Sequence, residues 1–265
     1  MLAIDQRESL RQMLTAGSGR AVADAELERF KTTVVEALSS AASAVLLDRD
    51  YGLEAARRSR APIILAADIL SQSTPGGPVD RAALDDGLTP EIARAADAAA
   101  LKMLVPWVPE RRDEAHELAA RFMDVCRAFG LPGIIEGVVR PLDIADWSDA
   151  DRDDALVLAA RDLAEHGPDL YKGEVPSYGT GDPEHITSVA RAITESLGMP
   201  WVVLSSGVAA SDFPAAVAAC VAGGAEGFLA GRAIWADATR ATDTATFLEQ
   251  ESRRRLVALA EGVHS

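Results

Sequence analysis

Cysteine and lysine are both scarce in this chain of 265 residues. Only two cysteines, Cys126 and Cys220, are present, and they lie far apart in the sequence. Disulfide frameworks use more cysteines and belong to oxidising compartments, so we predict two reduced thiols in a cytoplasmic protein. No run approaches the roughly 18 apolar residues of a membrane span. The first residues, Met1–Arg7, enter a strand-like run directly and lack the pattern of a signal peptide.

Positive charge is also in short supply. The formal net charge is -15, which argues against nucleic-acid binding because phosphate backbones are bound by clustered Lys and Arg. A small anionic substrate remains compatible with this charge, provided that its site is locally positive. The four histidines show no metal-ligand spacing, so we expect neither a bound metal nor another cofactor.

Of the 26 basic residues, only three are lysines: Lys31, Lys102 and Lys172. Arginine therefore supplies most of the positive charge in this chain. A lysine can do what arginine cannot, because its amine can lose a proton and attack a carbonyl group. Each lysine is thus a candidate for chemistry, although chance retention explains a single lysine equally well.

Short apolar runs alternate with longer amphipathic stretches about eight times along the chain, which is typical of βαβ units with parallel strands. Eight strands favour a closed (β/α)8 TIM barrel, so we predict an α/β fold with one domain spanning residues 1–265. The predicted strands are Leu2–Asp5, Ala44–Asp48, Pro62–Ala66, Leu101–Val105, Gly133–Glu136, Asp169–Glu174, Trp201–Leu204 and Gly227–Leu229. The predicted helices are Ala25–Leu38, Thr89–Ala99, Asp113–Phe129, Asp149–His166, Pro183–Leu197 and Asp212–Ala222.

Two stretches outside this pattern need an interpretation. Ser71–Asp86 is rich in Pro, Gly and Asp and is either a lid or a surface excursion, of which we favour the excursion. An acidic run is interpreted as a solvated helix start and not as a metal site; its members are Asp143, Asp146, Asp149, Asp151, Asp153 and Asp154.

Active sites of (β/α)8 barrels form at the carboxyl ends of the strands, so polar residues that close apolar runs are candidates by position. These residues are Asp5, Gln6, Arg7, Asp48, Lys102, Glu136, Lys172, Ser205, Ser206, Gly231 and Arg232. Two amines and a carboxylate suit carbonyl chemistry, with Lys172 as the nucleophile, Lys102 as a nearby cation and Glu136 as general acid and base. The alternative is a buried Lys–Glu ion pair that only stabilises the barrel.

The loops after the seventh and eighth strands often bind phosphate in this fold. Here they contain Ser206–Gly207 and Gly231–Arg232. Glycine lets the backbone approach phosphate oxygens, and Arg232 can contact two of them. The alternative is that the small residues allow tight packing of strand against helix.

Four segments carry a resemblance to a known family: MLAIDQRESLR, DLYKGEVPSYGTG, PWVVLSSGV and GFLAGRAIWA. They resemble the class I ketose-phosphate aldolases, a group that includes tagatose-1,6-bisphosphate and sulfofructosephosphate aldolases. The resemblance implies that Lys172 forms a Schiff base and that Lys102 and Glu136 handle protons. It also implies substrate contacts by Asp5 and Gln6, and phosphate contacts by Ser206, Gly207 and Arg232. We expect Arg7, Asp48 and Gly231 to complete the substrate site.

The runs LKMLVPW, SSGV and GFLAGRAIW look nearer to the sulfofructosephosphate branch. The resemblance therefore implies cleavage of 6-deoxy-6-sulfofructose 1-phosphate, in sulfoquinovose degradation, to dihydroxyacetone phosphate and sulfolactaldehyde. Arg7 is then a candidate contact for the sulfonate. Tagatose 1,6-bisphosphate is the alternative substrate, and a non-catalytic sugar-phosphate-binding barrel is the alternative from a different class. One residue departs from the family pattern, since Gly173 stands where the family usually has a valine. We also expect a homo-oligomer, because such barrels often self-associate.

Overall fold

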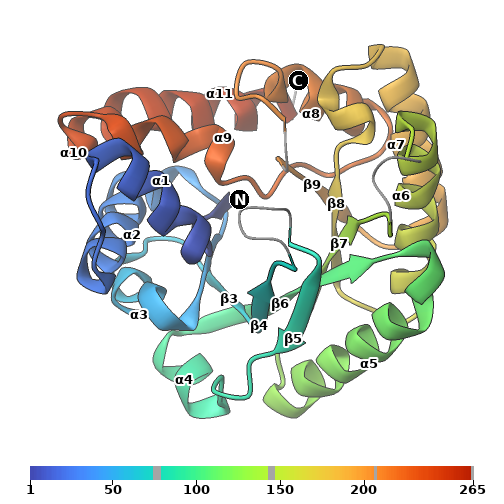
Figure 1. Ribbon diagram of the computed structural model, residues 1–265, viewed down its shortest axis with the longest axis horizontal. Coiled ribbons are helices and arrows are strands. Elements are labelled where there is room, and N and C mark those ends of the chain that lie inside the picture. The colour runs from blue at the N-terminus through green and yellow to red at the C-terminus, as the bar shows by residue number, and fades with distance from the viewer. Residues whose placement is uncertain (74–78, 143–146, 206–207, 264–265) are drawn as a thin grey trace. The chain divides into compact units, whose positions relative to one another are not determined.

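The structure is a computed structural model that describes residues 1–73, 79–142, 147–205 and 208–263 (Figure 1). The chain forms two compact units. The first unit comprises Met1–Ala66, Leu88–Ala99 and Leu229–Ser265, and the second comprises Ala67–Gly87 and Ala100–Phe228. Each unit combines segments that are distant in sequence, and each is described by itself.

The first unit contains three parallel strands, β1 (Leu2–Ala3), β2 (Val45–Leu47) and β3 (Ile63–Ala66), in that order. Leu2 also forms a parallel bridge with Ala230, on the side of β1 opposite to β2. The helices of this unit are α1 (Glu8–Ser18), α2 (Asp24–Leu38), α3 (Arg49–Arg58), α4 (Pro90–Ala95), α9 (Arg232–Trp235), α10 (Thr244–Phe247) and α11 (Arg253–Val263). Apolar residues at helical spacing bury one face of α2, including Leu27, Val34 and Leu38. Figure 1 shows α2 and α3 side by side.

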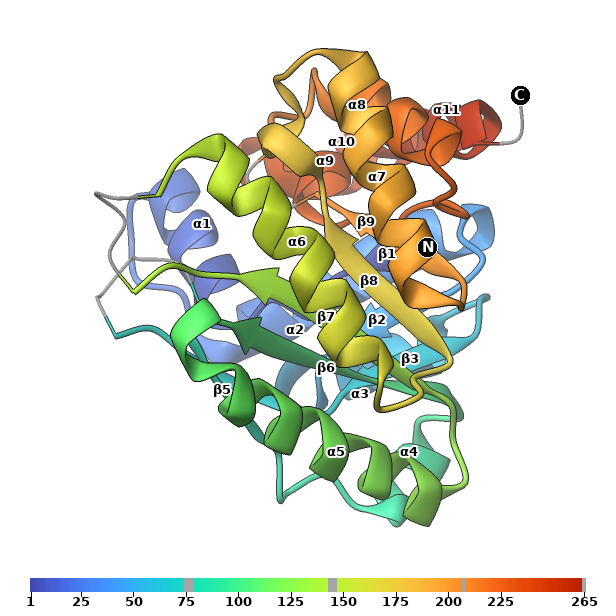
Figure 2. The same cartoon turned by 90° about the vertical axis from the view of Figure 1, so that its right-hand side faces the viewer.

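The second unit contains the parallel strands β6 (Ala98–Trp107), β7 (Gly133–Val139), β8 (Leu170–Glu174) and β9 (Trp201–Leu204), of which β6 begins in the first unit. Val203 of β9 forms a parallel bridge with Phe228. The helices α5 (Arg112–Phe129), α6 (Asp149–Ala164), α7 (Pro183–Leu197) and α8 (Phe213–Ala222) belong to this unit. Figure 2 shows α6 lying across β7 and β8, so these strands are covered by helices as in other parallel sheets.

The predicted strands agree with the observed ones to within a few residues, and the segment around Phe228 and Ala230 takes the place of the eighth strand through its two bridges. Helix α6 begins as its sequence suggests, because Ser148 and Asp151 cap each other's backbone N–H groups. The predicted helix Thr89–Ala99 is wrong at its end, since α4 stops at Ala95 and β6 starts at Ala98. Helices α1, α3, α9, α10 and α11 were not among the predicted helices.

Part of the stretch Ser71–Asp86 forms regular structure that its composition did not predict. Ser71 ends β4 (Asp68–Ser71) and residues 81–84 form β5 (Arg81–Leu84), which pairs with β4 in an antiparallel hairpin. Leu70, Val79 and Ala82 pack against a buried cluster made of Leu104, Val138 and Leu204. The hairpin is therefore a packed part of the second unit.

Both cysteines are buried and unbridged, as predicted. Burial raises the pKa of each thiol to about 12, so neither is a reactive thiolate at neutral pH. Within the described ranges, no helix is both long enough and apolar enough to cross a membrane.

Candidate active site

The three predicted catalytic side chains meet in the second unit. Lys102, Glu136 and Lys172 come from the adjacent strands β6, β7 and β8, and Glu136 is the register partner of Lys172. Nζ of Lys172 donates to Oε2 of Glu136 over 3.0 Å. Nζ of Lys102 lies 2.6 Å from the same oxygen. One carboxylate oxygen therefore joins the two amines.

This cluster is nearly closed to solvent. Lys102 is 1% exposed, Lys172 4% and Glu136 5%. Charges so deeply buried must be paired, because an isolated buried ion loses its hydration without compensation. The arrangement satisfies that requirement and also places a proton acceptor within hydrogen-bond distance of an amine, as general acid–base chemistry needs.

A fourth member of the cluster, Asp68, was not among the predicted site residues. Its Oδ2 accepts hydrogen bonds from Nζ of Lys102 over 3.1 Å and from the backbone N–H of Leu104 over 2.9 Å. Asp68 is 1% exposed and opens β4, immediately after the apolar strand β3. Asp5 and Asp48 were selected because each is an acidic residue at the end of an apolar run. The same criterion identifies Asp68.

Tyr171 explains the departure from the family pattern at Gly173. A Cβ atom on Gly137 would lie 2.1 Å from the Tyr171 hydroxyl oxygen, and one on Gly173 would lie 3.1 Å from the Tyr171 ring. These glycines are register partners on β7 and β8, so together they leave room for the ring. Burial raises the pKa of Tyr171 far above its ordinary value, and the phenol is therefore neutral and serves packing.

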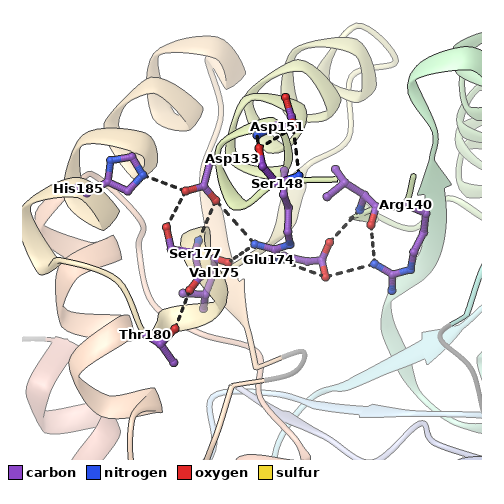
Figure 3. Close-up of polar contacts among 11 residues, drawn as sticks. Arg140, Ser148, Asp151, Asp153, Glu174, Val175, Ser177, Thr180 and His185 are labelled. Atoms are coloured by element: carbon purple, nitrogen blue, oxygen red, sulfur yellow. Dashed lines mark hydrogen bonds and ion pairs between the residues drawn. The ribbon is translucent and has the colours of Figure 1, made fainter. Parts of the chain in front are cut away.

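Arg152 and Asp153, two consecutive residues of α6, hold the segment after Lys172, and Figure 3 shows Asp153 beside Ser177 and His185. Nη1 of Arg152 donates to the carbonyl oxygen of Val175 over 3.0 Å, and Nη2 lies 3.5 Å from Glu174. Glu174 also accepts from the backbone N–H of Val139 over 2.8 Å and lies 3.4 Å from Arg140. The carboxyl ends of β7 and β8 are thereby tied together next to Glu136 and Lys172.

Asp153 corrects the interpretation of the acidic run. It is 3% exposed and receives both the backbone N–H and the hydroxyl of Ser177, over 2.8 and 2.7 Å. His185 Nε2 lies 3.0 Å from the same carboxylate. Ser177 and Tyr178 both have left-handed backbone conformations, with φ of 48° and 50°. Asp153 is thus not a solvated residue of a helix start but holds a strained turn that follows β8.

Lys31 organises the predicted substrate residues of the first unit. Its Nζ donates to the carbonyl oxygens of Ile4 and Gln6 over 2.7 and 2.8 Å, and to Oδ1 of Asp48. Three acceptors match the three N–H bonds of an ammonium group. Burial lowers the pKa of Lys31, while Asp48 acts in the opposite direction. This lysine, which was absent from the predicted strand-end residues, fixes the chain on both sides of Asp5.

Two other predicted residues of this unit, Asp48 and Gly231, lie next to Arg7 and Gln6. Asp48 is fully buried and also caps α3 by accepting the N–H of Tyr51 over 2.8 Å. Arg7 lies 3.9 Å from Asp48, and a Cβ on Gly231 would lie 3.2 Å from the Gln6 amide nitrogen. The Oε1 atom of Gln6 is buried and has no hydrogen-bond partner among the described residues. A buried orphan acceptor is suited to a hydroxyl donor on a ligand.

Arg232 is exposed and begins the short helix α9, directly after Gly231. Ser206 and Gly207, the other residues of the predicted phosphate site, lie outside the described residues. A separate cavity of about 300 Å³ in the first unit is lined by α1, α2 and residues near α10, including Arg29, Phe30 and Arg240. It contains none of the predicted catalytic or substrate residues, so it carries no weight in assigning the site.

Comparison with known proteins identifies the family. Residues 1–237 match the model of the DeoC/LacD family aldolases. The chain belongs to this aldolase family. It is 28% identical to a tagatose 1,6-diphosphate aldolase of Listeria monocytogenes, over 89% of this chain and 77% of that protein. It is also 28% identical to tagatose 1,6-diphosphate aldolase 2 of Streptococcus pyogenes, over 90% of this chain and 80% of that protein.

Among solved structures, a Schiff-base-forming fructose-1,6-bisphosphate aldolase matches with a TM-score of 0.67 at 18% identity. The likeness covers 98% of this chain and 92% of that one, and it confirms the predicted α/β barrel fold. The family match confirms the predicted aldolase resemblance. The protein is accordingly a carbon–carbon lyase of the aldolase type.

Proposed function

We propose that the protein is a class I aldolase that cleaves a ketose 1-phosphate to dihydroxyacetone phosphate and an aldehyde, with Lys172 as the Schiff-base residue. The observation that carries the proposal is the pairing of two buried amines with one carboxylate oxygen, at 3.0 Å for Lys172 and 2.6 Å for Lys102. An amine nucleophile must be neutral to attack a carbonyl carbon, and Glu136 is within reach to accept its proton.

In the first half of the reaction, the neutral amine of Lys172 attacks C2 of the ketose and forms a carbinolamine. Glu136, now protonated, donates its proton to the departing hydroxyl group, which leaves as water. The product is an iminium ion, whose positive nitrogen can accept an electron pair from the adjacent carbon–carbon bond.

In the second half, Glu136 removes the proton of the C4 hydroxyl, directly or through a water molecule, as the C3–C4 bond breaks. The electron pair of that bond moves to the iminium nitrogen and leaves an enamine, while the aldehyde departs. Protonation of the enamine at C3 and hydrolysis of the resulting imine release dihydroxyacetone phosphate and restore the amine of Lys172. Lys102 remains charged beside Glu136 and favours its ionised form when a proton must be taken up.

Two ketose phosphates are candidate substrates. The names of the relatives support tagatose 1,6-bisphosphate, whereas the motifs LKMLVPW and GFLAGRAIW motivate 6-deoxy-6-sulfofructose 1-phosphate. Both carry the same phosphate at C1, for which we propose Arg232 with Gly231, Ser206 and Gly207. They differ at C6, where the anion is a doubly charged phosphate or a singly charged sulfonate, and Arg7 is the proposed contact. Asp5, Gln6 and Asp48 complete the proposed substrate site.

The test is borohydride reduction in the presence of dihydroxyacetone phosphate, followed by peptide mass spectrometry. We expect a stable adduct on the peptide that contains Lys172, and none in Lys172→Arg, which keeps the charge but cannot form an imine. Reversible binding of dihydroxyacetone phosphate without an adduct would instead support a non-catalytic binding barrel. Comparing kcat/KM for the two ketose phosphates then assigns the substrate.

A further inference from the structure

Asp68 is a buried carboxylate that the proposed reaction does not use. It comes from β4, the first strand of the hairpin, and its Oδ2 lies 3.1 Å from Nζ of Lys102. The backbone N–H of Leu104 donates to the same oxygen, so the carboxylate is fixed from two sides. Lys102 therefore lies between two carboxylates, Asp68 and Glu136, whereas Lys172 is paired with Glu136.

The signs of these charges alternate across the strands in the order Asp68, Lys102, Glu136 and Lys172. With all four groups ionised, the cluster holds two positive and two negative charges and is neutral. The proposed reaction requires Lys172 to lose a proton and Glu136 to hold one. Once Glu136 is neutral, it no longer balances Lys102, and a buried cation without a counter-ion is costly.

We propose that Asp68 is a positioning residue that acts as the counter-ion of Lys102 and so allows Glu136 to hold the proton that Lys172 releases. This inference rests on the proposed function. In the transfer, an N–H bond of the Lys172 ammonium breaks and an O–H bond forms on Glu136. Asp68 and Lys102 then remain as an ion pair beside a neutral acid and a neutral amine. The total charge of the cluster is unchanged, so the transfer needs no charge to enter or leave the protein interior.

Two titratable groups on β8, Tyr171 and Glu174, lie near the cluster among the described residues, and neither replaces Asp68. Tyr171 faces Gly137, away from the amines, and burial raises its pKa so that it stays neutral. Glu174, on β8, accepts the N–H of Val139 and lies near Arg140 and Arg152. The carboxylate of Glu174 is thus balanced by those two arginines and belongs to a separate network.

The experiment compares the pH dependence of cleavage in the wild type, Asp68→Asn and Asp68→Glu. Without the charge of Asp68, the cluster carries one additional positive charge and releases its shared proton to solvent at lower pH. We expect the alkaline limb of the kcat profile of Asp68→Asn to move to lower pH by about one unit or more, as for a charge lost within 4–6 Å. Because Lys172 is then neutral, borohydride trapping should persist at pH values where turnover is lost.

Asp68→Glu keeps the charge and should return the alkaline limb toward its wild-type position. The matched control is Asp162→Asn, which removes a buried carboxylate that pairs with Arg112 outside this cluster and should leave the limb in place. If the wild type forms no adduct, the proposed function fails. If the wild type forms the adduct but the pH profile of kcat is the same in Asp68→Asn and in the wild type, only the proposed role of Asp68 fails. Should Asp68→Asn not fold, a downward shift of the limb in Asp68→Glu would overturn the inference.

Discussion

Glu136 and Lys172 are register partners on neighbouring parallel strands, and Nζ of Lys172 donates to Oε2 of Glu136 over 3.0 Å. Parallel pairing of β7 and β8 fixes the distance between their Cα atoms. The side chains need only extend from the same face of the sheet to meet. The geometry of the proposed proton transfer is thus set by the backbone hydrogen bonds of the sheet.

Replacing Glu136 with Gln keeps the shape of the side chain but removes its charge and its ability to exchange a proton. We expect kcat for ketose 1-phosphate cleavage to fall by at least about 100-fold, in the range usual for loss of a general acid–base. Steady-state kinetics measures this, and circular dichroism checks that the variant folds. A folded Glu136→Gln enzyme with more than about a tenth of wild-type kcat would exclude Glu136 from proton transfer.

Replacing Asp153 with Asn tests the network after β8. Two donors from Ser177 and one from His185 converge on its buried carboxylate, and the loss of charge weakens all three hydrogen bonds. We expect the free energy of unfolding to fall by about 2–4 kcal/mol, as for loss of one partner from a buried charged network. Urea denaturation provides the measurement. Asp154→Asn, at the exposed neighbouring position, is the control and should change stability by less than about 0.5 kcal/mol.

Gly173→Val restores the residue usual in the resembled family. In this chain the rings of Tyr171 and Trp201 occupy the adjacent space, at 3.1 and 3.4 Å from a Cβ on Gly173. Overpacking should lower the free energy of unfolding by about 1–3 kcal/mol. As a control, Gly262→Ala in α11 meets no atoms within 4 Å and should be neutral or slightly stabilising. A stable Gly173→Val protein would show that the rings can move aside.

We expect His166 to make the free energy of unfolding depend on pH. Its ring lies 2.9 Å from that of His116, Nε2 to Nδ1, and burial together with His116 lowers the pKa of His166 below 6.5. The unfolded chain therefore binds a proton first as the pH falls. The contribution of His166 to the free energy of unfolding is fully present above pH 6.5. It is lost as the pH falls from there through the pKa that His166 has in the folded protein. Urea denaturation between pH 7 and 5 should show this loss, and His166→Gln should reduce it. An unchanged slope in the variant would assign the loss to other groups.

Local patterns in the sequence were enough to predict the strands and the three catalytic candidates. Lys102, Glu136 and Lys172 interrupt apolar strands, and a parallel sheet brings such interruptions together. Asp68 was missed because it begins β4, the first strand of the hairpin with β5, and the Pro- and Gly-rich composition of the stretch between these strands concealed the hairpin. That 1–265 is one domain, and that the chain self-associates, remain predictions.

Asp153 was misread for a different reason. Most residues in a run of acidic side chains are expected to face solvent. Composition alone does not reveal that one of them, Asp153, faces the protein interior. Helical spacing offers the better signal, since Asp153 shares a face with the buried residues Leu156 and Ala160. The partner of its carboxylate, Ser177, lies in another element, so no local pattern could have identified the contact.

The burial of all three lysines, at 0%, 1% and 4% exposure, has a consequence for the chemistry of the protein's surface. Every exposed basic side chain is arginine or histidine, and neither of these reacts as a primary amine. Acylating reagents and lysine-directed modifying enzymes therefore meet no lysine on the folded molecule. A label that appears on lysine reports an opening of the protein, and a label on Lys172 reports an opening that the proposed Schiff-base reaction also requires.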